Sequence, residues 1–125
     1  MDFSTAEPVA FLYAADRDRA IRFYCGTLGL TLRSSDGFGD FIEAGRAAIR
    51  LTVFPDYKPG PHPVFGFNVA DIRAAAAALR DRGVAMTIYE GMGQDADGVW
   101  TAPDGTAKVA WFADPDGNVL SLSEA

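Results

Sequence analysis

Short hydrophobic runs separated by polar turns divide the chain into a regular series of elements. The apolar and aromatic run Val9–Ala14 predicts a buried strand. A helical pattern follows, with Asp16 as its N-cap and Gly29 at its C-terminal end. Its apolar positions, spaced at helical intervals, are Ala20, Ile21, Tyr24 and Leu28. Three more strands are predicted at 30–34, 38–44 and 47–54, so the first half has the order β-α-β-β-β.

The same order is predicted again after a proline-rich stretch. Residues 55–63 contain four prolines in nine residues, which excludes a helix or a central strand and indicates a short, stiff linker. A strand at 64–69 then leads into a helix that Asp71 caps and Gly83 ends. The remaining strands are predicted at 86–90, 108–113 and 119–124.

The two halves also align residue by residue. Val9 falls on Val64 and Asp16 on Asp71, and Leu12 and Ala15 fall on equivalent apolar residues of the second half. Together with the repeated element order, this alignment indicates an internal duplication. We therefore predict one α+β domain over residues 1–125, with module one at about 8–54, a linker at 55–63 and module two at about 64–124.

The last two strands are joined by strong turn chemistry. In Asp114-Pro115-Asp116-Gly117-Asn118, proline presets φ, the carboxylates bond nearby N–H groups, and glycine or asparagine tolerates positive φ. In the strand that follows, Val119, Ser121 and Ser123 face one side, and Leu120, Leu122 and Glu124 face the other.

Composition and charge exclude several classes of partner. The formal net charge of −6 argues against nucleic acid and against an anionic membrane surface. No apolar run has the length of a membrane span, and the N-terminal residues lack the pattern of a secretion signal, so a cytoplasmic protein is expected. Cys25 is the one cysteine, and the one histidine, His62, lies in the linker, so Cys25 is expected to pack in its helix rather than act as a nucleophile.

Three motifs together indicate a family. They are Asp16-x-x-x-Ala20-x-x-Phe23-Tyr24 with Leu28-Gly29-Leu30, Val69-x-Asp71 with Leu79 and Gly83, and Phe112-x-Asp114-Pro115-Asp116-Gly117-Asn118. Over residues 8–124 the sequence resembles the vicinal oxygen chelate superfamily, which contains glyoxalase I, extradiol dioxygenases and bleomycin-resistance proteins. The resemblance implies curved mixed sheets around a cavity, with helices on the convex side and the ligand on the concave side. It also implies a homodimer, and it leaves open whether modules pair within one chain or between chains.

The positions at which this resemblance places metal ligands carry the wrong side chains. They are Val9, Arg50, Val64 and Ser121. Valine has no lone pair, and arginine is a permanent cation that repels a metal ion. We therefore expect no metal and no other cofactor, and no metal-dependent glyoxalase or dioxygenase activity.

We predict nine ligand-binding residues, seven of which strand alternation places on the concave face, with Trp100 and Trp111 expected at the mouth of the cavity. They are Arg50, Tyr13, Phe11, Thr52, Phe54, Asn68, Trp100, Trp111 and Ser121. Such a surface suits a medium-sized organic molecule with flat apolar parts and an anionic or carbonyl group. Arg50 is the first candidate, although it is equally able to pair with Glu43 or Asp40 on the neighbouring strand. The two tryptophans, with Tyr57 and Tyr89, also suit core packing or dimer burial, and the loop 91–98 is either a lid or a solvated connection.

Two main functional hypotheses follow, and the sequence does not decide whether any reaction is catalysed. The first is metal-independent binding or sequestration of an aromatic, polar small molecule, as in bleomycin-resistance proteins. The alternative is a glyoxalase-like lyase or isomerase that uses acid/base groups, with Tyr13 beside Arg50 as a proton donor. A third reading, a regulatory or structural protein that uses the dimer as a scaffold, has less support.

Overall fold

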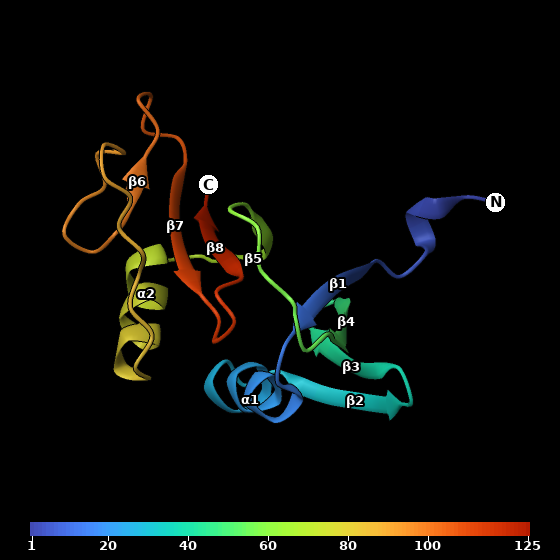
Figure 1. The fold of residues 1–125 in the computed structure, drawn as a ribbon. Helices are drawn as coiled ribbons and strands as arrows, with labels where there is room; N and C mark the ends of the chain where they lie inside the picture. Colours follow the sequence, from blue (N-terminus) through green and yellow to red (C-terminus); the bar gives the residue numbers. More distant parts are fainter. The chain divides into compact units, whose positions relative to one another are not determined.

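Two compact units make up the chain. The structure, a computed structural model, describes all of residues 1–125, and these divide into Met1–Lys58 and Pro59–Ala125. Each unit contains one four-stranded mixed sheet and one main helix (Figure 1). No helix is long and apolar enough to cross a membrane.

The first unit has the predicted β-α-β-β-β order. Its strands are β1 (Val9–Ala14), β2 (Thr31–Asp36), β3 (Gly39–Ala44) and β4 (Ala47–Val53), arranged in the sheet as β1-β4-β3-β2. β1 is parallel to β4, and the other neighbours are antiparallel. A short 3₁₀ turn, η1 (Phe3–Thr5), precedes β1, and the helical segment consists of α1 (Arg17–Ile21) and η2 (Arg22–Thr27).

The second unit repeats this topology. Its strands are β5 (Pro63–Asn68), β6 (Trp100–Thr101), β7 (Lys108–Ala113) and β8 (Val119–Glu124), in the order β5-β8-β7-β6, and its helix is α2 (Ile72–Asp81). β5 is parallel to β8, as β1 is to β4, and the remaining pairs are antiparallel. The predicted α+β fold of two β-α-β-β-β modules is therefore confirmed.

The first helix has the predicted extent but a wider second half. The Asp16 carboxylate caps its start by accepting a hydrogen bond from the Arg19 N–H. From Arg22 onward the segment is a π-helix, and the Leu28 N–H bonds the Phe23 carbonyl at 2.9 Å. Gly29 then ends it at φ +75°, a conformation that glycine adopts without steric cost. The apolar spacing predicted the helix but does not distinguish α from π winding.

The predicted strand at 86–90 is wrong. This segment makes no strand ladder with β7, and only the Thr87 N–H reaches across, to the Trp111 carbonyl at 2.7 Å. Two of its other backbone groups, the Tyr89 N–H and the Thr87 carbonyl, bond the Gln94 side chain. Gln94 accepts from the Tyr89 N–H at 2.7 Å and donates to the carbonyls of Thr87 and Gly98 at 2.9 and 2.8 Å. The ladder position beside β7 belongs instead to the two-residue β6.

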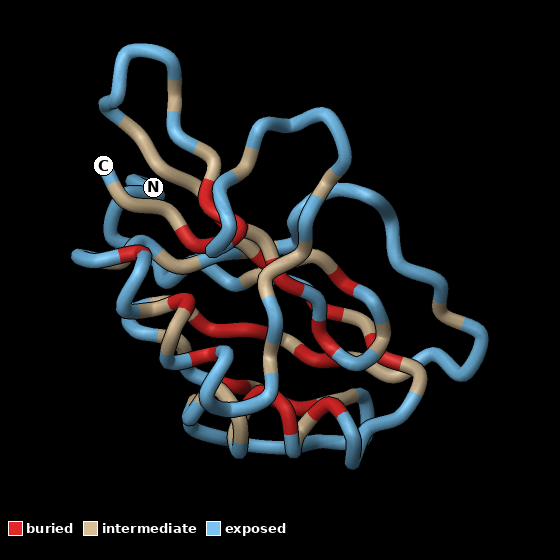
Figure 2. The backbone as a smooth tube through the Cα atoms, turned by 90° about the vertical axis from the view of Figure 1, so that its left-hand side faces the viewer, coloured by how far each residue is buried: buried red, intermediate tan, exposed pale blue.

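Burial separates the two faces of each sheet. In β1, Leu12 and Ala14 are buried, and Leu12 lies in register with buried Leu51 of β4. In β8, Leu120 and Leu122 are buried, and they lie in register with Phe112 and Ala110 of β7. We call these the helix-covered faces, and we call the opposite side of each sheet its open face. The buried stretches are drawn in red in Figure 2, and the outlying loops are drawn pale blue.

Contacts from each helix show which face it covers. Arg17 of α1 reaches Asp40 of β3, which lies in register with Leu51. The Ile72 N–H at the start of α2 bonds the carboxylate of Glu124 at 2.9 Å, on the same side of β8 as Leu122. Apolar side chains of both helices complete the cores, and they are Ala20, Phe23, Tyr24, Ile72, Ala76 and Leu79.

The turn before β8 has the chemistry that its sequence predicts. Asp114 Oδ1 accepts hydrogen bonds from the backbone N–H groups of Asp116 and Asn118 at 2.9 and 2.8 Å. Asn118 Nδ2 donates to Asp114 Oδ2 at 2.8 Å, and Gly117 lies at φ +90°. The turn therefore fixes where β8 begins, and with it which residues of β8 face the open side.

Candidate functional site

The open face of the first sheet carries five of the predicted ligand-binding residues. Phe11 and Tyr13 of β1 alternate with buried Leu12, and in the parallel register Phe11 lies opposite Arg50 and Tyr13 opposite Thr52. Phe54 follows the end of β4, and its ring contacts that of Tyr13. Phe11 is 61% exposed and Phe54 53% exposed. Large aromatic side chains on a sheet face without a helix mark an interaction surface.

Arg50 is held by a partner that the sequence reading did not identify. Its two terminal nitrogens bond the Asp36 carboxylate at 3.1 and 2.8 Å, and its guanidinium lies 4.5 Å from the centre of the Phe41 ring. These bonds raise the pKa of Arg50 and lower that of Asp36. The expected pairing with Glu43 or Asp40 is wrong, because a bulge in β2 between Leu32 and Ser34 brings Asp36 to the open face.

Asp40 lies on the opposite side of the same sheet. Its side chain is 1% exposed, and it accepts two bonds from Arg17, at 2.9 and 2.7 Å, and one from the Ser35 hydroxyl at 2.5 Å. Burial alone raises the pKa of Asp40, but the bonds from Arg17 and Ser35 outweigh it and hold the pKa below its usual range. This ion pair, in which only the carboxylate is buried, attaches α1 to β3 and lies away from the open face.

Aromatic rings cluster at the C-terminal end of β1. The Tyr13 ring lies 5.3 Å from that of Phe54 and 5.8 Å from that of Tyr57, which comes from the linker. Tyr13 therefore belongs to an aromatic cluster, whereas the Arg50 guanidinium is stacked on Phe41. At the other end of this face, Arg33 bonds Glu7 at 3.1 Å.

The open face of the second sheet carries the remaining candidates. Ser121 of β8 lies in register with Gly66 of β5 on one side and with Trp111 of β7 on the other. Asn68 lies opposite Ser123 in the next row of this face. Trp100 of β6 pairs with Val109, which shares this face, and the Tyr89 ring meets that of Trp111 edge-on at 5.6 Å. The face is aromatic, neutral and hydroxylated, as its strand alternation predicts.

Two of the four positions expected for metal ligands, Arg50 and Ser121, occupy equivalent places in the two sheets. Arg50 lies opposite Phe11, which is two residues beyond Val9. In the same way Ser121 lies opposite Gly66, which is two residues beyond Val64. The two valine positions differ in register, because Val9 pairs with Ala48 whereas Val64 lies in the register shift between Pro63 and Phe65.

The chemistry of this donor set does not fit a metal ion. Val9 and Val64 offer no donor atom, and Arg50 is a cation already paired with Asp36. Ser121 alone supplies an oxygen, and no group of three His, Cys, Asp or Glu side chains in the structure is arranged to hold a metal. A neutral hydroxyl is a poor sole ligand for a transition metal.

The loop 91–98 is tied down at both ends. Arg73 of α2 bonds the carboxylates of Asp95 and Asp97 at 2.7 and 2.9 Å, and Asp95 Oδ1 accepts from the Val99 N–H at 3.0 Å. Hydrogen bonds from Arg73 lower the pKa of Asp95. With Gln94 filling the loop interior, this segment has the contacts of a fixed connection rather than of a lid.

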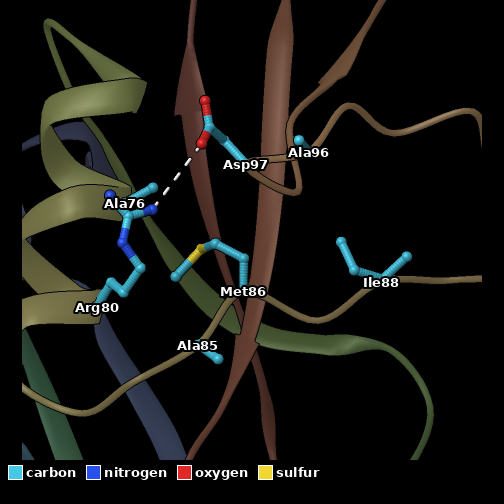
Figure 3. Close-up of a pocket in the computed structure, with 7 residues that line it drawn as sticks. All are labelled: Ala76, Arg80, Ala85, Met86, Ile88, Ala96 and Asp97. Carbon is cyan, nitrogen blue, oxygen red and sulfur yellow. Dashed lines mark ion pairs between the residues drawn. The ribbon is translucent and has the colours of Figure 1, made fainter.

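Two small hollows lie away from the open faces. One of about 160 Å³ lies between α2 and the segment before β6, with the Arg80–Asp97 ion pair of 3.9 Å at its edge (Figure 3). Met86 and Ile88 supply its apolar lining. The other, of about 210 Å³, lies beside the β2–β3 hairpin next to Arg17. Both are smaller than the roughly 300–1,000 Å³ usual for organic ligands.

Cys25 has no sign of activation. Burial, and then the nearby Asp40 carboxylate, raise the pKa of its thiol, which is opposite to the shift that a nucleophilic cysteine needs. Cys25 lies in the π-helical segment on the side of the sheet away from the open face.

Comparison with known proteins establishes the family. The model of the glyoxalase/bleomycin resistance protein/dioxygenase superfamily matches residues 7–122. The chain belongs to this superfamily. No curated protein matches the sequence.

Solved structures share the fold over nearly the whole chain. A glyoxalase family protein from Enterococcus faecalis is 17% identical, with a TM-score of 0.77 over 98% of this chain and 100% of that one. A superfamily member from Sphaerobacter thermophilus is 25% identical, with a TM-score of 0.73 over 97% of this chain and 98% of that one. An integron cassette protein from a Halifax Harbour sewage outfall is 20% identical, with a TM-score of 0.73 over 97% and 99%. These likenesses show the fold and leave the activity open.

Proposed function

We propose that this superfamily member binds a medium-sized aromatic and polar organic molecule without a metal ion. One observation carries the proposal: each open face presents aromatic side chains, such as Phe11 on the first and Trp111 on the second, together with hydroxyl or amide groups of its own sheet. These side chains contribute nothing to the helix-covered cores. Aromatic surface with a few polar groups is the usual composition of an organic ligand site.

The donor chemistry supports the metal-free part of this proposal. Metal-dependent catalysis in proteins needs at least three firm ligands and an open coordination position. Here two positions are valines and a third is Arg50, which is bound to Asp36. Sequestration, as in drug-resistance proteins of this superfamily, requires only an adapted surface and no reacting group.

A homodimer in the cytoplasm is part of the same proposal. The exposed aromatic residues of the first open face favour an apolar cover in water, which a bound ligand or a second copy of the chain supplies. The sequence resemblance implies a dimer, and the proposal leaves module pairing within or between chains to experiment. Neither nucleic acid nor a membrane is an expected partner, given the net charge of −6.

The test is binding by metal-stripped protein. Protein dialysed against EDTA is heated with quinolin-2-one, quinoline-2-carboxylate, 4-nitrophenol or bleomycin, and its melting temperature is recorded. Because a ligand that binds only the folded state stabilises it, at least one probe at about 100 times its Kd is expected to raise the free energy of unfolding by about 2.7 kcal/mol. No shift with any probe contradicts the proposal.

The alternative activity has its own assay. A glyoxalase-like enzyme turns over the hemithioacetal of glutathione and methylglyoxal. We expect no turnover by this protein, with or without added Zn²⁺, Ni²⁺ or Mn²⁺. Turnover that is lost on chelation contradicts the metal-free proposal, and turnover that survives chelation favours the acid/base alternative with Tyr13 and Arg50.

A further inference from the structure

The two open faces differ in how far their polar groups are already occupied. On the first sheet the leading polar candidate, Arg50, gives both terminal nitrogens to Asp36. On the second sheet the side chains of Asn68, Ser121 and Ser123 make no hydrogen bond within the chain. The second face therefore carries three uncommitted polar side chains, all of them neutral, whereas on the first face the Thr52 hydroxyl is uncommitted and Arg50 is occupied.

No charge competes on that second face. The charged side chains of β7 and β8 are Lys108 and Glu124, which lie opposite each other and pair at 3.5 Å. Glu124 also accepts from the Ile72 N–H at the start of α2, so this pair belongs to the helix-covered side. A charged ligand that bound to this open face would lose hydration water and would find no side chain of opposite charge in its place.

Position 66 carries a glycine although the backbone conformation there does not require one. Its φ is not in the left-handed region, so an ordinary residue is conformationally allowed there. A side chain at position 66 is excluded by lack of space. A Cβ at Gly66 would overlap Ser121 Oγ and would stand 2.6 Å from the Ser121 carbonyl oxygen. The Ser121 hydroxyl thus occupies the room over Gly66, and the glycine determines where that hydroxyl lies. A glycine inside a strand often marks a close approach of this kind.

Aromatic surface adjoins this hydroxyl. Trp111 lies opposite Ser121 on the other side from Gly66, and the edge-on contact with Tyr89 fixes the plane of its ring. Across the row from β5 to β7, Gly66 and Ser121 are therefore small and Trp111 is large. A flat ring placed over the first two residues contacts the side of the third.

We propose that the open face of the second sheet selects an uncharged planar ring with an adjacent donor and acceptor, such as a lactam or a carboxamide. The ring lies over Gly66 beside Trp111, and its polar edge bonds the Ser121 hydroxyl and the Asn68 amide. Gly66 acts as a positioning residue for that hydroxyl. This inference rests on the proposed binding function and names the class of ligand that the site takes.

The experiment compares three related rings on EDTA-dialysed, ¹⁵N-labelled protein. Quinolin-2-one is neutral and planar, its octahydro derivative is neutral and puckered, and quinoline-2-carboxylate is planar and anionic. Binding is followed at the indole N–H of Trp111, which a Trp100→Phe variant distinguishes from that of Trp100. We expect quinolin-2-one to bind at least tenfold more tightly than either analogue.

Two variants test the roles of the named residues. Gly66→Ala displaces the Ser121 side chain, so quinolin-2-one is expected to bind at least tenfold more weakly. Gly60→Ala is the matched control, because a Cβ there meets nothing within 4 Å and φ is unstrained. Ser121→Ala leaves the backbone undisturbed should Gly66→Ala fail to fold, and it is expected to lower the affinity for quinolin-2-one about tenfold. Ser121→Ala is also expected to abolish the preference for quinolin-2-one over N-methylquinolin-2-one, which lacks the ring N–H donor.

The outcomes separate this inference from the proposed function. Equal or tighter binding of the carboxylate, or wild-type affinity in Ser121→Ala, overturns the inference and leaves metal-free binding standing. Absence of any response to every probe, including 4-nitrophenol and bleomycin, overturns both.

Discussion

At the scale of single residues, neighbouring carboxylates in the first sheet have opposite roles because strand alternation and one bulge place them on opposite faces. Asp36 holds Arg50 on the open face, and Asp40 holds Arg17 beneath α1. The sequence singles out Arg50 and Asp40 but neither Asp36 nor Arg17, and it does not reveal the bulge after Leu32 that decides which arginine meets which carboxylate. Pairing across strands depends on register, which local sequence patterns leave unspecified.

Replacement of Arg17 tests the ion pair with Asp40. Arg17→Ala leaves the Asp40 carboxylate, 1% exposed, with Ser35 as its remaining side-chain partner. Loss of the charged partner of a buried carboxylate destabilises the folded state, so the free energy of unfolding in urea is expected to fall by more than in a surface control. Arg46→Ala, in the exposed β3–β4 turn, is the control and is expected to change it by less than about 0.5 kcal/mol. Equal effects of the two variants contradict the assignment.

The same pair predicts how stability depends on pH. The pKa of Asp40 is held below its usual range in the folded chain, and an unfolded aspartate titrates near ~3.9. Between these two values the unfolded state binds more protons, so stability is present above the unfolded pKa and is lost as the pH falls through the folded one. Urea unfolding of Asp40→Asn between about pH 5 and 2.5 is expected to depend less on pH than that of the wild type. Identical slopes show that Asp40 is not the group responsible.

At the scale of secondary structure, strong apolar patterns predicted the elements well, and side-chain contacts account for the failures. Strands at Val9–Ala14, Lys108–Ala113 and Val119–Glu124 have the predicted bounds. The segment 86–90 has strand-forming residues but no ladder, because Gln94 bonds two of its backbone groups. Side-chain to backbone hydrogen bonds of this kind compete locally with the ladder. A glutamine in a polar loop gives no sign of this role in the sequence.

Replacement of Gln94 tests this explanation. Gln94→Ala leaves the Tyr89 N–H and the carbonyls of Thr87 and Gly98 without this partner. Hydrogen exchange at the Tyr89 amide is expected to accelerate at least tenfold, and stability is expected to fall by about 2 kcal/mol. Gln94→Glu keeps the acceptor for Tyr89 and loses the donor, so it is expected to protect that amide more than alanine does. Unchanged exchange in Gln94→Ala shows that the segment is held by other contacts.

At the scale of the whole molecule, the duplication predicted from sequence is present as two sheets with the same strand order. Equivalent registers place Arg50 and Ser121 at matching positions, and all the proposed ligand-binding residues lie on open faces. For Phe11, Tyr13 and the other residues of the predicted concave face, alternation sufficed, because Leu12 and Leu120 fix which side is buried. Sequence could not show that Arg50 is occupied by Asp36, nor that Gly66 makes room for the Ser121 hydroxyl.

Assembly is tested by mass in solution. Because Phe11 and Phe54 expose large aromatic surfaces, we expect light scattering after size exclusion to give twice the mass of the chain. Phe11→Glu places a charge in that surface and is expected to weaken the dimer. Phe38→Glu, in the exposed β2–β3 turn, is the matched control and is expected to leave the mass unchanged. A monomeric wild type at micromolar concentration contradicts the dimer.

The central claim is that an organic ligand binds to the open faces without metal. Titration of EDTA-dialysed, ¹⁵N-labelled protein with quinolin-2-one, repeated after addition of Zn²⁺, tests it most directly. The account predicts saturable shifts at the amides of Gly66, Ser121 and Trp111 without metal and the same affinity with it. Shifts that appear only after Zn²⁺ is added, or that map to α1 and α2 instead, would contradict it.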